Sequence, residues 1–128
     1  MKLLLDTCTF LWLVRGDRQL SEAATRLFQD PANEVFLSSV SAWEIAVKNS
    51  IGKLPLADAP ARYVPRERER HGIDPLPLAE SETLMLDKLP PVHADPFDRL
   101  LVCQAIQHGL TLLTPDPLIH RYPVAVQW

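Results

Sequence analysis

Apolar residues along the chain fall into short continuous runs separated by longer stretches with a helical period. Four short runs cover Lys2–Leu5, Glu34–Ser38, Leu110–Leu113 and Val124–Trp128. Runs of this kind are typical of strands that are buried on both faces of a parallel sheet. A fifth run, Ile73–Leu78, contains prolines, which cannot donate to a strand ladder. We therefore expect the fifth strand at an edge of the sheet.

The stretches between the predicted strands carry helix start and stop signals. Ser21 is placed to cap one helix, Asp30 to close it, and Gly52 and Gly109 to end two others. The expected helices are Phe10–Val14, Ser21–Phe28, a helix from Ser39 or Ser41 to about Ile51, Ala57–Arg70, Ala79–Leu89 and Leu100–His108, with a short turn or helix at Asp116–His120. Strands that alternate with helices predict an α/β fold with right-handed crossovers, in one domain spanning residues 1–128.

Composition and charge exclude several classes of protein. The chain has 128 residues, 47% of them hydrophobic, and a formal net charge of -3, so it lacks the strongly basic surface of a protein that coats nucleic acid. The negative charge does not exclude a nuclease, because a bound metal ion makes the local potential positive. Cys8 and Cys103 have no metal-finger spacing, and we expect free thiols in a reducing compartment.

The amino terminus has the apolar character of a signal peptide. Asp6 interrupts the run Met1–Leu5, however, and no convincing cleavage site follows. No stretch approaches the length of a membrane span. We therefore expect a cytoplasmic protein that does not associate with a membrane.

Acidic residues recur where predicted strands end and helices begin. Asp6 follows the first strand, Asp116 follows the strand Leu110–Leu113, and Glu44 lies in an otherwise apolar helix. Asp95 and Asp98 open the helix that leads to His108. The carboxyl ends of parallel strands meet at one edge of a sheet, so these side chains are expected to converge. A cluster of oxygen ligands predicts a site for Mg²⁺ or Mn²⁺.

Each of these acids also has a local explanation. Asp6 is able to cap the helix that follows it, and Glu44 to pair with a lysine one turn later. Asp95 and Asp98 fit the N-cap and N3 positions around a proline, and Asp116 fits a turn. The shared position of the acids, rather than any single one, favours the metal site.

Other chemistries find little support. The four histidines are scattered without a zinc-binding spacing, and neither a G-x-S-x-G motif nor a glycine-rich phosphate loop is present. Arginines gather between Arg62 and Arg70, where a solvated helix of mixed charge is the commoner explanation. The alternative is a rim that binds RNA phosphates, and its candidate residues are Arg66, Arg68, Arg70 and Arg99.

Five motifs are spread over nearly the whole chain: Leu4–Thr7, Ser41–Ile45, Gly52–Leu54, His93–Leu101 and Leu113–Asp116. Together they resemble the PIN-domain ribonucleases, and among them the VapC-type toxins of bacterial toxin–antitoxin modules. The resemblance implies a three-layer α/β/α domain with a mainly parallel central sheet. It also implies an endoribonuclease that depends on Mg²⁺ or Mn²⁺, forms a homodimer and is inhibited by a small antitoxin protein.

The resemblance also assigns the site. The family's catalytic and metal-binding acids fall on Asp6, Glu44, Asp98 and Asp116. Thr114 is a secondary candidate as a hydroxyl helper, and Asp95 a second one from the subgroup's motif. The implied reaction is hydrolysis of RNA phosphodiester bonds with one or two divalent ions, giving a 5′-phosphate and a 3′-hydroxyl.

Two other functions compete with this one. An aspartyl-phosphate phosphatase also begins with a strand and an aspartate, but this chain has Cys8 where such an enzyme needs a second acid. A catalytically silent PIN-like module that only binds RNA or protein is the other alternative. The intact set of acids disfavours the silent module.

Overall fold

The computed structural model describes residues 1–128 and contains one five-stranded sheet of order β3-β2-β1-β4-β5. All neighbouring strands pair in parallel. The strands are β1 (Lys2–Leu5), β2 (Glu34–Ser38), β3 (Asp74–Leu76), β4 (Thr111–Leu113) and β5 (Val126–Gln127). The predicted α/β class with a parallel sheet is confirmed, and the proline-containing strand β3 lies at an edge, as expected.

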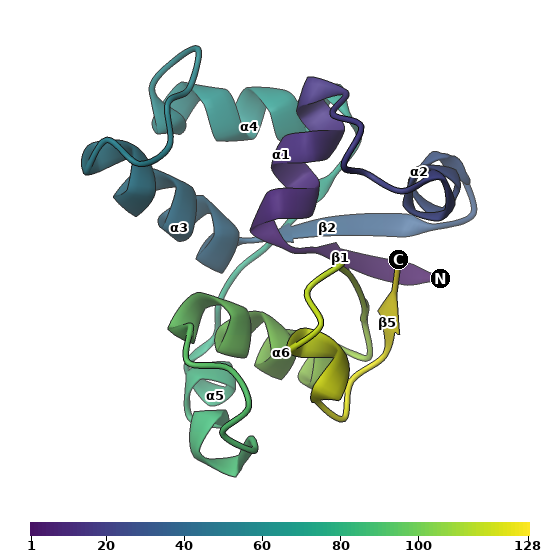
Figure 1. The fold of residues 1–128 in the computed structure, drawn as a ribbon, viewed down its shortest axis with the longest axis vertical. Helices are drawn as coiled ribbons and strands as arrows, with labels where there is room; N and C mark the ends of the chain where they lie inside the picture. The colour runs from purple at the N-terminus through teal and green to yellow at the C-terminus, as the bar shows by residue number, and fades with distance from the viewer.

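Helices cover both faces of the sheet (Figure 1). They are α1 (Thr7–Arg15), α2 (Glu22–Gln29), α3 (Ser39–Ser50), α4 (Pro60–Arg70), α5 (Glu80–Thr83) and α6 (Pro96–His108), with short 3-10 helices η1 (Leu86–Lys88) and η2 (Ile119–Arg121). Figure 1 shows α1 and α4 on one side of β1 and β2, and α5 and α6 on the other. None of the helices is both long and apolar enough to cross a membrane.

The alternation of side chains along β1 explains the two layers of core. Leu3 and Leu5 pack with α1 and α4 on one face, whereas Leu4 packs with α6 on the other. All three leucines are completely buried. Because successive side chains of a strand point to opposite faces, a continuous apolar run is required only where both faces are covered.

Several sequence-based boundaries differ from the structure. The helix expected over Ala79–Leu89 is wrong, since the segment divides into α5 and η1. Glu82 caps the start of α5 by accepting from the Ala79 amide, and its contacts with Gln104 and His108 join α5 to α6. The N-cap of α3 is Ser38 rather than Ser39 or Ser41, and α4 begins at Pro60 rather than Ala57.

The register of the central strands fixes where polar residues gather. Leu5, the last residue of β1, lies beside Leu37 of β2 and Leu113 of β4. The next residues along these three segments are therefore Asp6, Ser38 and Thr114, all buried at the carboxyl edge of the sheet. This edge forms the floor of the site.

Candidate metal centre

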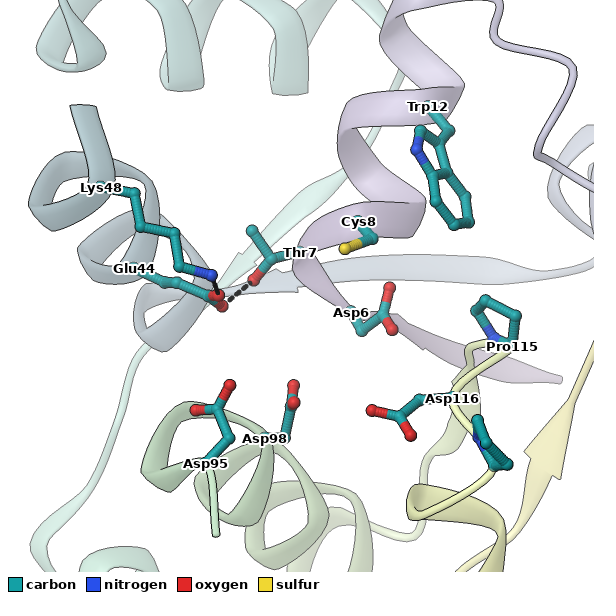
Figure 2. Close-up of a pocket in the computed structure, with 11 residues that line it drawn as sticks. Asp6, Thr7, Cys8, Trp12, Glu44, Lys48, Asp95, Asp98, Pro115 and Asp116 are labelled. Atoms are coloured by element: carbon teal, nitrogen blue, oxygen red, sulfur yellow. Dashed lines mark hydrogen bonds and ion pairs between the residues drawn. The ribbon is translucent and has the colours of Figure 1, made fainter. Parts of the chain in front are cut away.

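A pocket of about 320 Å³ lies at the carboxyl edge of the sheet. Residues from α1, α3, the start of α6 and the loop after β4 line it: Asp6, Thr7, Cys8, Trp12, Glu44, Lys48, Asp95, Asp98, Pro115, Asp116 and Pro117. Figure 2 shows the carboxylates of Asp6, Asp98 and Asp116 directed into a common space. The structure thus brings together all five acids that the sequence singled out.

Asp6 lies at the centre of the floor and also caps α1. Its Oδ1 accepts a hydrogen bond of 2.7 Å from the Thr9 amide, and its Oδ2 accepts one from the Thr114 hydroxyl. The side chain is almost fully buried, and burial raises the pKa of its carboxyl group despite these hydrogen bonds. Both donors hold the carboxylate in a fixed orientation.

Two acids come from the first turn of α6. Asp95 is the N-cap and accepts a hydrogen bond of 2.9 Å from the Phe97 amide, with Pro96 in the first turn. Asp98 lies one turn further and faces the pocket. Burial, reinforced by the charges of Asp95 and Glu44, raises the pKa of Asp98 to about 7. The metal-free pocket therefore disfavours full ionisation of its acids.

Asp116 is held by the loop that follows β4. Its Oδ1 accepts a hydrogen bond of 2.9 Å from the Leu118 amide, and its own amide donates to the Thr114 hydroxyl at 3.1 Å. The same hydroxyl donates to Asp6. Thr114 therefore links two acids from separate strand ends, which is a structural basis for its place among the predicted site residues.

Glu44 is buried on α3 and contacts two side chains of the pocket wall. Its Oε1 accepts a hydrogen bond of 2.6 Å from the Thr7 hydroxyl, and its Oε2 pairs with the Lys48 ammonium (Figure 2). The hydrogen bond to Glu44 raises the pKa of Lys48. Glu44 therefore forms the local pair with Lys48 and also lines the pocket.

Sequence reasoning overlooked His93. Its Nε2 lies 2.9 Å from Asp116 Oδ2 and 3.1 Å from Asp98 Oδ2. The histidines were treated as scattered because none has a zinc-binding spacing to another. The available signal was the position of His93 two residues before Asp95, in the same short motif.

The four arginines proposed as a phosphate rim do not line the pocket. Arg66 pairs with Asp58 at 3.1 Å, and Arg70 lies 3.5 Å from Glu67. Arg68 donates to the Ile73 carbonyl and Arg99 to the Leu86 carbonyl. Arg66 and Arg70 are thus paired with acidic side chains, whereas Arg68 and Arg99 donate to backbone carbonyl groups. The structure assigns Lys48 as the cation at the pocket.

The donor set fits a hard divalent cation. Five carboxylates and one lysine line the pocket, and that lysine is already paired with Glu44. The remaining negative charge has His93 as its neighbour but no further lysine or arginine in the lining. Carboxylate oxygens suit Mg²⁺ and Mn²⁺. Burial and nearby carboxylates raise the pKa of the Cys8 thiol to about 11, which argues against thiolate chemistry in the same pocket.

Comparison with known proteins is consistent with this geometry. The PIN domain family model matches residues 3–125. Ribonuclease VapC16 of Mycobacterium tuberculosis is 42% identical over 57 residues, a match that spans 44% of this chain and 40% of that protein. The chain thus matches well under half the length of this curated relative.

Solved structures share the fold over nearly the whole chain. VapBC2 from Rickettsia felis, bound to a promoter DNA fragment, has a TM-score of 0.70 at 14% identity, covering 99% of this chain and 98% of that one. VapBC from Salmonella typhimurium, bound to DNA, has a TM-score of 0.69 at 16% identity, covering 99% and 97%. VapBC-1 from nontypeable Haemophilus influenzae has a TM-score of 0.65 at 18% identity, also covering 99% and 97%.

Proposed function

Because this chain belongs to the PIN-domain family, we propose that it is a divalent-metal-dependent endoribonuclease and the toxin of a toxin–antitoxin module. The observation that carries the proposal is the convergence of Asp6, Asp98 and Asp116 on one pocket. The similarity to a ribonuclease named VapC16 supports RNA as the substrate. A catalytically silent binding module has no need for several buried, mutually repelling carboxylates.

The acids of the pocket would hold one or two ions of Mg²⁺ or Mn²⁺. Asp6, Asp98 and Asp116 are the proposed ligands, since their carboxylates face one another across the pocket. When bound, a divalent ion lowers the pKa of water and stabilises the charge that develops on the phosphate. Thr114 keeps Asp6 and Asp116 in place through its hydroxyl group.

Glu44 and Lys48 form the wall of the proposed site. Thr7 and Lys48 contact one oxygen of Glu44 each, so this carboxylate has a fixed orientation. Its proposed role is to orient the attacking water. Lys48 is the basic side chain of the pocket lining and is partly exposed, which makes it the proposed contact for an RNA phosphate. Attack by water needs no covalent intermediate, in agreement with the raised pKa of Cys8.

We further assign a protein partner to the chain. The VapBC structures that share its fold support an antitoxin partner. Charge complementarity favours a basic segment of that partner over the acidic pocket. We also propose that the chain forms a homodimer and acts in the cytoplasm.

The test is incubation of the purified protein with end-labelled RNA, with and without Mg²⁺ or Mn²⁺. We expect cleavage only with the ion, leaving 5′-phosphate and 3′-hydroxyl ends. Lys48→Met should weaken RNA binding, whereas Lys53→Met, on a lysine outside the pocket, should not. Absence of cleavage across a set of unrelated RNAs, by a folded protein that binds them, would favour the silent module.

A further inference from the structure

His93 lies between two carboxylates of the pocket but is not one of the residues that line it. Its Nε2 is 2.9 Å from Asp116 Oδ2 and 3.1 Å from Asp98 Oδ2. The side chain is only 15% exposed. The imidazole therefore contacts both acids without lining the pocket.

The other nitrogen of the ring determines which atom carries the hydrogen. The Asp95 amide donates to His93 Nδ1 at 3.2 Å. A ring nitrogen that accepts a hydrogen bond has no hydrogen of its own, so in the neutral ring Nε2 is the protonated atom. The Nε2–H group then points at the two carboxylates and donates to them. Coordination of a metal through Nε2 would need the hydrogen on Nδ1, where it would face the Asp95 amide.

The backbone around His93 is fixed as well. The His93 amide donates to the hydroxyl of the buried Tyr122 at 2.8 Å. Arg99 of α6 donates to that hydroxyl at 3.2 Å and to the Pro90 carbonyl at 3.1 Å. Arg99, a candidate for the phosphate rim, thus holds the loop that carries His93.

Asp98 and Asp116 need such a support because they come from different elements. Asp98 belongs to α6 and Asp116 to the loop after β4, and their negative charges repel each other. An octahedral ion with ligands at about 2.1 Å separates neighbouring ligand atoms by about 3 Å, so the acids must be held close before the ion binds. The His93 Nε2–H group, as a donor shared by Asp98 and Asp116, keeps the two carboxylates close.

We propose that His93 is a positioning residue of the metal centre, whose Nε2–H group holds Asp98 and Asp116 together without binding the metal itself. The inference rests on the proposed function, since it assumes that the acids hold a divalent ion. Loss of an outer hydrogen-bonding partner typically weakens metal affinity by about 10–100-fold. His93→Ala should weaken Mg²⁺ binding by that factor, and His93→Gln, which retains an N–H donor, should restore part of it.

The experiment combines two readouts on the full chain. Nitrogen NMR of ¹⁵N-labelled wild-type protein reports which ring nitrogen of His93 is protonated, before and after addition of Mg²⁺. Calorimetric titration measures the Mg²⁺ affinity of wild type, His93→Ala and His93→Gln. His71→Ala serves as the control, because His71 contacts Glu67 on α4 and not the pocket.

We expect a hydrogen on Nε2 with and without Mg²⁺, weaker binding by His93→Ala and unchanged binding by His71→Ala. A hydrogen that moves to Nδ1 when Mg²⁺ binds would make His93 a ligand and overturn the inference. Equal or tighter binding by His93→Ala would overturn it too, while leaving the proposed function intact. Failure of the folded wild type to bind Mg²⁺ or Mn²⁺ would reject both proposals.

Discussion

At the scale of single residues, the acids of the pocket combine a local and a collective role. Asp6 caps α1 and Asp95 caps α6, yet both face the same cavity as Asp98. In Asp6 the cap hydrogen bond uses one oxygen and the Thr114 hydroxyl the other, and each carboxylate oxygen keeps a further lone pair for a metal ion. An acidic residue can therefore cap a helix and also line the pocket. Asp6 and Asp95 do both because they lie at the carboxyl edge of the sheet.

Asp98 gives a pH-dependent prediction for the metal-free protein. Its pKa rises from an ordinary value of 3.8 to about 7 in the folded state, mainly through burial. The folded state therefore favours the protonated acid, so this stabilising contribution is complete below about pH 4 and is lost as the pH rises through 7. Asp98→Asn removes the ionisation and should unfold at a higher temperature than wild type at pH 8.

The size of the effect follows from linkage. Each pKa unit corresponds to about 1.4 kcal/mol, so the difference at pH 8 is on the order of a few kcal/mol. Thermal melts of both proteins at pH 4.5 and pH 8, in the presence of a chelator, measure it. A difference in melting temperature that is the same at both pH values would contradict the raised pKa.

At the scale of elements, the first turn of α6 separates two roles. Asp95→Ala removes the N-cap and should cost about 1 kcal/mol of unfolding free energy, with substantial cleavage activity retained. Asp98→Asn should abolish metal-dependent cleavage without destabilising the protein, because Asp98 faces the pocket. Urea midpoints and RNA cleavage rates of both variants make the comparison. An inactive but fully stable Asp95→Ala, beside an active Asp98→Asn, would reverse the assignment.

The elements themselves were largely predictable from local pattern. Apolar runs located all five strands, and Ser21 and Gly109 marked helix ends as observed. The division of Ala79–Leu89 was not predicted. In the structure Glu82 joins the short helix α5 to Gln104 and His108 of α6, more than twenty positions away, and contacts of this range leave no local pattern in the sequence.

The site was predictable where it follows from topology. Carboxylates after parallel strands converge, and Asp6 and Asp116 do so through Thr114. The contacts of His93 and Arg99 were not predictable, because they include backbone groups that no sequence pattern identifies. Charge alone favoured Arg99 as a phosphate ligand, whereas the structure directs it to carbonyl oxygens.

At the scale of the whole molecule, bound metal should stabilise the fold. A ligand that binds only the native state at a hundredfold excess over its Kd adds roughly 2.7 kcal/mol to the unfolding free energy. Millimolar Mg²⁺ or Mn²⁺ should therefore raise the melting temperature of wild type. Asp116→Asn should reduce or abolish the increase, since it removes a carboxylate from the pocket. A melting temperature indifferent to both ions would contradict the account.

Growth of bacteria tests the proposed biological role. Expression of the wild-type chain should slow growth, because uncontrolled RNA cleavage is harmful, and co-expression of the neighbouring reading frame should restore it. Asp98→Asn, expressed to the same soluble level, should be harmless. Normal growth with soluble wild-type protein would count against the toxin assignment.

The most direct test of the central claim is the location of a metal ion in a crystal of the wild-type protein grown with Mn²⁺. Anomalous scattering identifies the ion independently of any activity. The account predicts an anomalous peak inside the pocket, coordinated by carboxylate oxygens of Asp6, Asp98 or Asp116, with His93 outside the coordination sphere. An empty pocket at saturating Mn²⁺, or a peak bound only elsewhere on the molecule, would contradict the assignment of this acidic cluster as a metal centre.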